Sequence, residues 1–192
     1  MTRTQLRPFY SEAERAQVYG RSYDHTRWGD HIERVAVTAG LVAGAVNRFR
    51  LTSVADLSCG DGAIVQLARR TALTGRAVLG DLVKRPGLDI AGPIEETILQ
   101  LMPVDLYVCS ETLEHVEDPD ELLRRVRDKA RFLVLSTPDG ETGSDNPEHY
   151  WGWDRDDVRA MLQAAGWNPQ SMLTLRSEPS YYTFQIWLAE RS

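Results

Sequence analysis

The fold of this chain is decided by one stretch, Val54-Ala55-Asp56-Leu57-Ser58-Cys59-Gly60-Asp61-Gly62. It begins as a short apolar run typical of a buried strand, and apolar residues recur at helical spacing from Ala63 to Arg70. A strand, a glycine-rich loop and a helix are therefore expected in this order. Because Gly60 and Gly62 have no side chain and adopt positive φ easily, a ligand can approach the loop backbone closely. The amides at the start of the following helix favour a negatively charged group.

The same alternation continues along the chain. Asp30 is expected to cap a helix over 30–49, and residues 82–93 are expected to form a loop because they are rich in proline and glycine. Further helices are expected near 11–19, after Asp118-Pro119, and over 154–165; further strands are expected over 76–81, 104–109, 131–136, 171–175 and 182–188. This order predicts an α/β fold, a three-layer sandwich around a seven-stranded, mostly parallel sheet with the last strand antiparallel.

Length and composition restrict the class of protein. The 192 residues suit a single domain, with an N-terminal cap segment over 1–29 and the main domain over 30–192. Two cysteines do not make a disulfide framework, no apolar run is long enough to cross a bilayer, and no signal peptide is recognisable. We therefore expect a cytoplasmic protein without a membrane partner. A net charge of −6 disfavours a general nucleic-acid binder. The oligomeric state is left open.

Polar side chains gather where the expected strands end. In parallel sheets, ligands bind beyond the carboxyl ends of the strands. Asp81 ends the second strand, 25 residues after Asp56, and Ser110-Glu111-Thr112 follows a later one. A carboxylate at the position of Asp81 accepts hydrogen bonds from both hydroxyls of a ribose. These residues predict a ligand that contains a nucleoside.

Three stretches carry a resemblance to a known family. Residues 54–62 resemble motif I of the class I, Rossmann-like S-adenosylmethionine-dependent methyltransferases, with Ser58 in place of the usual first glycine. Residues 104–119 resemble the family's fourth strand and the loop after it, and residues 132–138 resemble its fifth strand and the following turn. The resemblance covers about residues 50–190. It implies methyl transfer from S-adenosylmethionine to an oxygen or nitrogen of a small-molecule acceptor.

The resemblance also implies a role for individual residues. Asp56 and Gly60 would flank the methionine end of the cofactor, Asp81 would bind its ribose, and Ser110 and Glu111 would line the methionine side. Trp28, in the segment before motif I, would close over the methionine moiety. The full cofactor-binding set expected from the sequence is Asp56, Ser58, Gly60, Gly62, Asp81, Leu82 on the adenine face, Ile94 against the adenine ring, Ser110 and Trp28.

Residues 111–115 are open to three interpretations: a metal site, a catalytic or acceptor contact without a metal, and a purely structural role. Glu111, Glu114 and His115 have the spacing E-x-x-E-H, and on a helical turn these positions would share one face. Together with His149 they form a candidate site for Mg or Mn, because carboxylates and imidazoles suit a divalent metal. Without a metal, His115 would act as a catalytic base or acceptor contact, with Glu111 facing the cofactor.

Three alternative functions follow from the same residues. Residues 136–138 and 151–156 also resemble small-RNA 3′-terminal ribose 2′-O-methyltransferases, which bind a metal through two Glu and two His; RNA is thus an alternative acceptor that the net charge disfavours. A non-catalytic S-adenosylmethionine-binding protein is a second alternative. A nicotinamide dehydrogenase is a third, and it is disfavoured because Ile64 and Val65 stand where its glycine pattern needs a third glycine.

Overall fold

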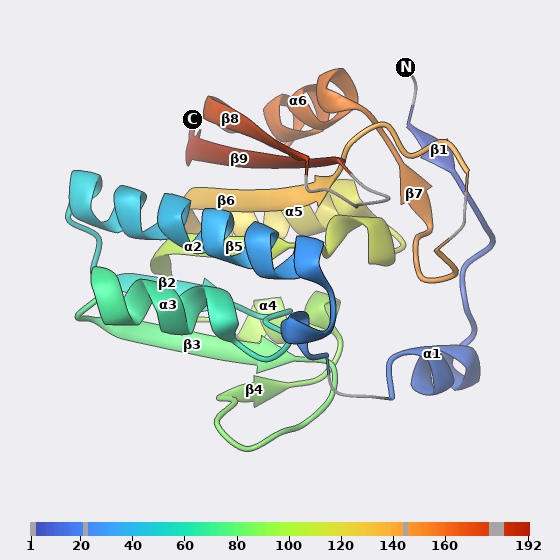
Figure 1. Ribbon diagram of the computed structural model, residues 1–192, viewed down its shortest axis with the longest axis horizontal. Helices are drawn as coiled ribbons and strands as arrows, with labels where there is room; N and C mark the ends of the chain where they lie inside the picture. The colour runs from blue at the N-terminus through green and yellow to red at the C-terminus, as the bar shows by residue number, and fades with distance from the viewer. Residues whose placement is uncertain (1–2, 21–22, 144–145, 177–182) are drawn as a thin grey trace.

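A computed structural model describes residues 3–20, 23–143, 146–176 and 183–192 of the chain. A seven-stranded sheet in the order β4-β3-β2-β5-β6-β9-β8 forms its centre (Figure 1). The pairs from β4 to β6 are parallel, whereas β9 runs antiparallel to both of its neighbours. The predicted sheet, with its antiparallel last strand, is confirmed.

The main sheet consists of β2 (Ser53–Asp56), β3 (Arg76–Asp81), β4 (Ile90–Ala91), β5 (Val104–Ser110), β6 (Ala130–Pro138), β8 (Trp167–Arg176) and β9 (Thr183–Arg191). The helices are α1 (Glu12–Val18), α2 (Gly29–Phe49), α3 (Ala63–Thr71), α4 (Ile94–Gln100), α5 (Pro119–Lys129) and α6 (Arg155–Ala164), with two 3-10 turns, η1 (His25–Arg27) and η2 (Leu113–His115).

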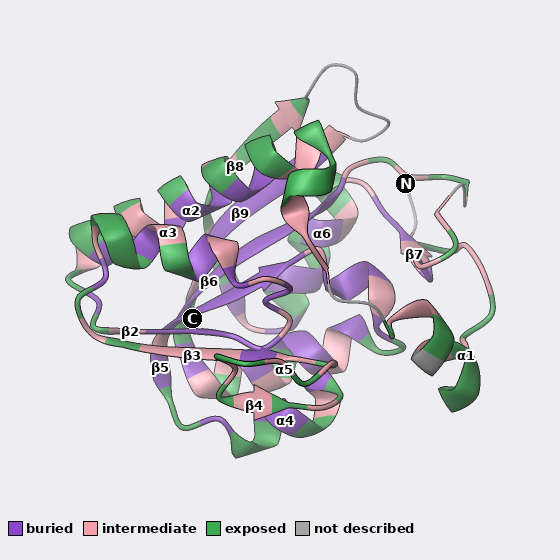
Figure 2. Cartoon of the chain, turned by 60° about the horizontal axis from the view of Figure 1, so that its bottom comes forward, coloured by how far each residue is buried: buried purple, intermediate pink, exposed green. Residues whose placement is uncertain are grey.

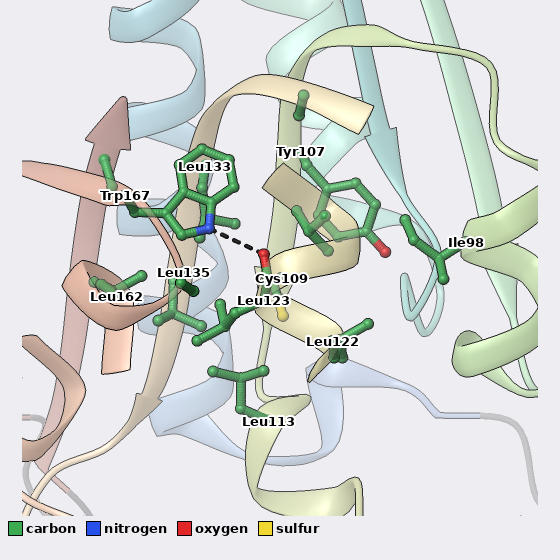
Figure 3. Packing of buried hydrophobic residues seen from close by; sticks show 14 of the residues in the cluster. Ile98, Tyr107, Cys109, Leu113, Leu122, Leu123, Leu133, Leu135, Leu162 and Trp167 are labelled. Atoms are coloured by element: carbon green, nitrogen blue, oxygen red, sulfur yellow. Dashed lines mark hydrogen bonds between the residues drawn. The ribbon is translucent and has the colours of Figure 1, made fainter. Parts of the chain in front are cut away.

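The helices cover the two faces of the sheet in separate layers (Figures 1 and 2). On one face, Val35, Val42 and Val46 of α2 and Val65 of α3 pack against the sheet around Phe132. Helices α4, α5 and α6 cover the other face. There Trp167 is fully buried among leucines, and its indole N–H donates to the backbone oxygen of Leu123 at 3.1 Å (Figure 3). Burial on both faces explains the continuous apolar run of β5.

Several expected element boundaries are wrong for identifiable reasons. Helix α2 begins at Gly29 after Trp28 as its N-cap, so Asp30 lies in the first turn and does not cap the helix; its charge there still suits the helix dipole. The sequence does not predict helix α4, because Gly92 and Pro93 favour a loop. Pro93 instead directly precedes the first helical residue, a place where a missing N–H costs no helical hydrogen bond. Tyr182, expected in the last strand, lies outside the described residues.

The N-terminal segment runs beside the carboxyl ends of the parallel strands. Its strand β1 (Thr4–Gln5) pairs antiparallel with β7 (Trp151–Gly152), and together they form a small second sheet that the sequence did not predict. Helix α1 follows, begun by a capping box between Ser11 and Glu14. The segment is thereby fixed at one end to the loop region after β6. Within the described residues, no helix is both long enough and apolar enough to cross a membrane.

Candidate functional site

A cavity of about 1250 Å³ opens at the carboxyl ends of β2, β3 and β5. Its walls include most of the residues singled out from the sequence: Trp28, Asp56, Ser58, Gly60, Asp81, Leu82, Ile94, Ser110, Glu111, His115 and His149. Two of the expected residues do not line it. Gly62 forms the N-cap of α3 behind the loop, and Glu114 is fully buried beneath the wall. Ile94 lines the cavity at the start of α4 while also packing in the core.

The glycine loop has the geometry expected of it. Gly60 and Gly62 have φ of 57° and 77°. The amide of Gly60 donates to Asp81 Oδ2 at 2.8 Å, which ties the loop to the end of β3. Arg85 also contacts Asp81, with 3.3 Å between Nη2 and Oδ2. Loop and strand end are therefore fixed relative to each other before any ligand arrives.

Ser58 has a structural explanation that the sequence did not offer. Its φ is not positive, so this position does not require glycine. Its hydroxyl lies 2.7 Å from the hydroxyl of Thr112 in the loop after β5, and its amide donates to Asp56 Oδ1 at 3.1 Å. The serine links two loops that both border the cavity.

Asp56 lies at the end of β2 with only 2% of its surface exposed. Burial raises the pKa of its carboxyl to about 7, and the charge of Asp81 acts in the same direction. No ion pair of Asp56 with a cation occurs among the described residues. A buried carboxylate without an ion pair is stabilised most by a ligand that brings a positive charge next to it.

We expect the Asp56→Asn variant to be more stable than the wild type at neutral and higher pH. The pKa of about 7 in the folded protein lies above the ordinary value of 3.8, so the native protein holds the proton more tightly than the unfolded chain does. Wild-type stability should therefore fall as pH rises from about 4 through 7, and the variant lacks this loss. Thermal unfolding at intervals of pH measures it: the difference in Tm should widen up to about pH 7 and then stay constant. A difference in Tm between variant and wild type that does not change with pH would contradict the raised pKa of Asp56.

A buried chain of hydrogen bonds crosses the floor of the cavity. Arg34 Nη1 donates to Ser110 Oγ at 2.6 Å, Ser110 Oγ lies 2.7 Å from Ser136 Oγ, and Ser136 Oγ donates to Glu111 Oε1 at 2.9 Å. Because Ser136 gives its proton to the carboxylate, Ser110 must donate to Ser136. Glu111 has a φ of 51°, which is uncommon for a residue with a side chain and is typical of functional sites.

Glu114, His115 and His149 come together beside this floor. Each offers a ligand atom, and the three atoms all lie within 4.8 Å of one another. The rings of His115 and His149 are 4.8 Å apart and nearly perpendicular. Glu114 Oε1 is buried and has no hydrogen-bond partner among the described residues, although Oε2 accepts from Thr137 at 3.1 Å. Burial raises the pKa of Glu114, and the neighbouring charge of Glu111 raises it further.

The protonation of His115 follows from its partners. Its Nδ1 faces the backbone oxygen of Glu148 at 2.9 Å, and a carbonyl oxygen only accepts. The proton therefore sits on Nδ1, and Nε2 keeps its lone pair. Burial lowers the pKa of His115 to about 3, so the ring is neutral. A neutral imidazole oriented by a carbonyl is the usual form of a metal ligand or a base.

A second set of residues holds Glu114 and His149, and the sequence did not point to it. The indole N–H of Trp153 donates to Thr137 Oγ1 at 2.9 Å, and Thr137 in turn donates to Glu114. Glu141 lies 2.6 Å from His149 Nδ1. Indole and hydroxyl groups carry no sequence spacing that signals such support, so only their positions in the structure make the role visible.

Glu111 does not join the group, contrary to the expectation from E-x-x-E-H. The helical turn assumed for this motif covers only Leu113–His115, as a short 3-10 turn, and Glu111 lies before it with positive φ. Its carboxylate accepts from Ser136 instead. The prediction that Glu111, Glu114 and His115 share one face of a helix is therefore wrong. His149 reaches the group from a distant loop, as the sequence analysis proposed.

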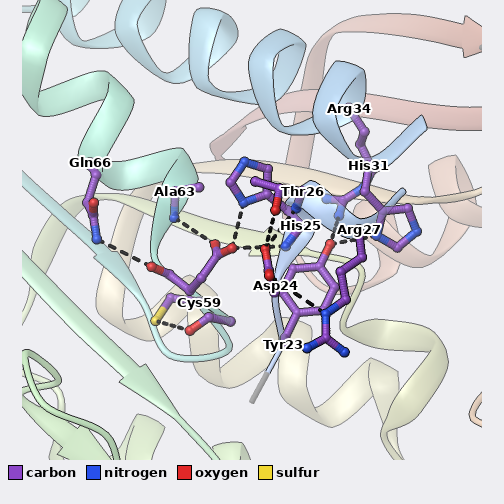
Figure 4. A network of polar contacts seen from close by, with 12 residues as sticks. Tyr23, Asp24, His25, Thr26, Arg27, His31, Arg34, Cys59, Ala63 and Gln66 are labelled. Atoms are coloured by element: carbon purple, nitrogen blue, oxygen red, sulfur yellow. Dashed lines mark hydrogen bonds and ion pairs between the residues drawn. The ribbon is translucent and has the colours of Figure 1, made fainter. Parts of the chain in front are cut away.

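Aromatic side chains of the N-terminal segment line the cavity near the glycine loop, and Figure 4 shows Tyr23 and His31 among them. Tyr23 stacks on Trp28 with ring centroids 6.2 Å apart, and its hydroxyl lies 2.6 Å from His31 Nδ1. His25 fixes the segment, because its ring Nδ1 lies 2.5 Å from Asp61 Oδ2 in the loop. Trp28 remains 49% exposed at the rim, so it is placed to contact a ligand but does not enclose the cavity.

Comparisons with solved structures identify the fold. The chain is similar in structure to the Burkholderia thailandensis 1,6-didemethyltoxoflavin-N1-methyltransferase with bound 1,6-didemethyltoxoflavin and S-adenosylhomocysteine. The TM-score is 0.71 and the sequence identity 18%, and the match covers 97% of this chain and 92% of the other. The chain has the fold of the class I S-adenosylmethionine-dependent methyltransferases.

Two further methyltransferases support this assignment. Magnesium protoporphyrin IX methyltransferase from Synechocystis PCC 6803, with bound S-adenosylhomocysteine, has a TM-score of 0.63 and 19% identity, over 92% of each chain. The small-RNA methyltransferase HEN1 has a TM-score of 0.64 and 17% identity, over 90% of this chain and 26% of that protein. No protein-family model and no curated protein sequence matches the chain.

Proposed function

We propose that this protein transfers a methyl group from S-adenosylmethionine to an oxygen or nitrogen of a small-molecule acceptor. The observation that carries this proposal is the meeting of the glycine loop, Asp56 and Asp81 at one cavity, on the fold of methyltransferases. Asp81 would accept from the ribose hydroxyls. Leu82, which is 42% exposed, would lie against the adenine. Asp56 would accept from the ammonium of the methionine moiety.

The cluster of Glu114, His115 and His149 fits a divalent metal. Glu114, His115 and His149 would hold it, because their ligand atoms converge and the buried Glu114 Oε1 has no other partner. Carboxylate and imidazole ligands suit Mg or Mn, with Mn favoured by the two imidazoles. When bound, the metal would lower the pKa of an acceptor hydroxyl and fix its oxygen. The His115 tautomer and the contacts of Thr137 and Glu141 keep the three side chains oriented.

Charge around the cavity favours a small acceptor over a nucleic acid. A polyanion needs unpaired cations along its path. Here Arg15 lies 3.6 Å from Glu117 and Arg27 lies 3.7 Å from Asp24. Carboxylates outnumber arginines among the described lining residues, with Glu12, Glu95, Glu96 and Glu148 near the rim. An uncharged or cationic acceptor suits this opening best.

The test uses S-adenosylmethionine labelled in its methyl group and a cell extract separated into metabolite and RNA fractions. We expect label in the metabolite fraction, its loss with EDTA and its return with Mn²⁺ or Mg²⁺. Full activity in EDTA would contradict a role for a divalent metal in methyl transfer. Binding of S-adenosylhomocysteine without methyl transfer to either fraction would support a non-catalytic cofactor-binding protein.

A ribose 2′-O-methyltransferase acting on RNA is the second candidate. It is favoured by the convergence of Glu114, His115 and His149, which would supply one Glu and both His of the two-Glu, two-His set of this class, and by the likeness to HEN1. Metal-dependent label at the 3′ ends of the RNA fraction, blocked by periodate oxidation of the terminal ribose, would establish it over the small-molecule acceptor.

Replacing Thr137 by valine should weaken metal binding by about 10- to 100-fold, because the hydroxyl that orients Glu114 is lost while the side-chain shape is kept. The measurement is the Mn²⁺ concentration that gives half-maximal methyl transfer. Thr174→Val, on the exposed part of β8, is the matched control and should leave this concentration unchanged. An unchanged value in both variants would show that Thr137 does not support a metal ligand.

A further inference from the structure

The side chain of Asn146 contacts one of the three candidate metal ligands. Its amide nitrogen Nδ2 lies 3.0 Å from Nε2 of His149, and both residues line the cavity. The backbone amide of Glu148 donates to Asn146 Oδ1 at 2.9 Å, which fixes the orientation of the side chain. The oxygen of the Asn146 amide therefore faces the backbone, and its NH2 group donates to the lone pair of His149 Nε2.

Nε2 is also the His149 atom that a metal would need. Glu141 Oε2 lies 2.6 Å from His149 Nδ1, and because a carboxylate accepts, the proton sits on Nδ1 and the lone pair on Nε2. One lone pair cannot accept from an amide and bind a metal at the same time. The cluster of Glu114, His115 and His149 thus has one ligand atom covered by Asn146, whereas Glu114 Oε1 has no hydrogen-bond partner among the described residues.

We propose that Asn146 controls the occupancy of the metal site, because its amide must leave His149 Nε2 before a divalent metal binds there. This inference rests on the proposed function, and within it on the metal site. A site that is competent to bind in only a fraction of the molecules has its affinity lowered by that fraction. A neutral hydrogen bond on the ligand atom corresponds to an affinity lowered by about 3- to 10-fold.

The other end of the Asn146 side chain supports a second ligand of the cluster. Its Oδ1 holds the turn over 146–149, in which the backbone amide of His149 donates to the backbone oxygen of Asn146 at 3.3 Å. The backbone oxygen of Glu148 in this turn faces His115 Nδ1 at 2.9 Å. Asn146 therefore has two contacts with different consequences: Oδ1 supports the turn that orients His115, and Nδ2 covers His149.

Asn146→Ser separates these two contacts. The serine hydroxyl can accept from the Glu148 amide as in an ST turn, but it is too short to reach His149. The affinity for Mn²⁺ is measured without an activity assay, from the loss of the electron paramagnetic resonance signal of free Mn²⁺ during a titration. We expect the variant to bind Mn²⁺ about 3- to 10-fold more tightly than the wild type. Asn47→Ser, at an exposed position near the far end of α2, is the control and should bind as the wild type does.

The sign of the change distinguishes this role from the two competing ones. If Asn146 supports His149 as a ligand, in the way proposed for Thr137 and Glu114, Asn146→Ser binds Mn²⁺ more weakly. If Asn146 only shapes the turn, the affinity for Mn²⁺ is unchanged. Either result would overturn the inference and leave the metal site and the proposed methyl transfer standing.

A structure of the wild type with Mn²⁺ tests the same inference without a variant. We expect Mn²⁺ on Glu114, His115 and His149, with Asn146 Nδ2 beyond hydrogen-bond distance of His149 Nε2. Mn²⁺ held by Glu114 and His115 with the amide still in place on His149 would overturn the inference alone. Failure of the wild type to bind Mn²⁺ would overturn both the metal site and this inference, whereas methyl transfer itself is tested separately by the label from S-adenosylmethionine.

Discussion

Glu114→Gln should lose methyl transfer by a factor on the order of 10² to 10³ while binding S-adenosylhomocysteine as tightly as the wild type. The amide keeps the shape of the side chain and still accepts from Thr137, but it removes the negative charge from the one ligand oxygen that lacks a partner. A bound metal contributes several kcal/mol of transition-state stabilisation, and each 1.36 kcal/mol corresponds to about tenfold in rate.

The comparison requires activity and binding to be measured on the same preparation. Glu117→Gln is the matched control, because Glu117 is an exposed carboxylate only three residues further along, and its activity should be unchanged. Equal activity of Glu114→Gln and the wild type would remove Glu114 from the chemistry. A parallel loss of cofactor binding would mean that the substitution has altered the fold of the site.

Gly60→Ala should reduce the affinity for S-adenosylhomocysteine by at least about 30-fold. With a φ of 57°, alanine here costs about 1–2 kcal/mol of backbone strain. The new Cβ would also meet Tyr23 at 2.5 Å, so the tyrosine must leave its place over the loop and its bond to Arg34. The backbone strain, the displacement of Tyr23 and the alanine methyl group beside the ligand all weaken binding.

The control for this substitution is Gly44→Ala in the middle of α2. Nothing lies within 4 Å of a Cβ at Gly44, and alanine is the better helix former by up to about 1 kcal/mol. Gly44→Ala should therefore raise the thermal stability and leave the affinity unchanged, whereas Gly60→Ala should lower both. Unchanged affinity in Gly60→Ala would show that the ligand does not approach this part of the loop.

Sequence patterns were sufficient for those parts of the fold and site that depend on neighbouring residues. The strand, loop and helix around Gly60, and the strand that ends at Asp81, are local features with their own spacing. The expectation that polar residues at strand ends meet at one edge is a consequence of parallel pairing, and it placed Asp56, Asp81 and Ser110 correctly at the cavity.

Other features of the site depend on tertiary contacts, which the spacing of residues along the sequence does not reveal. Arg34 occupies a helical position that looks like any solvent-facing cation, and its burial follows from the approach of Tyr23, Ser110 and Phe184. Glu111 and Glu114 are three residues apart as on a helix, but the chain turns with positive φ at Glu111 and directs it to Ser136. Ser58 is tolerated in place of glycine because its φ is not positive, and its hydroxyl contacts that of Thr112 in the neighbouring loop.

Calorimetric titration of the wild-type protein with S-adenosylhomocysteine and, in parallel, with NADH tests whether the cavity is built for S-adenosylmethionine. We predict that one molecule of S-adenosylhomocysteine binds per chain with a Kd in the range of about 1 μM to 1 mM, that Asp81→Ala weakens it at least about tenfold, and that NADH gives no binding. No binding of S-adenosylhomocysteine together with tight binding of NADH would contradict the account.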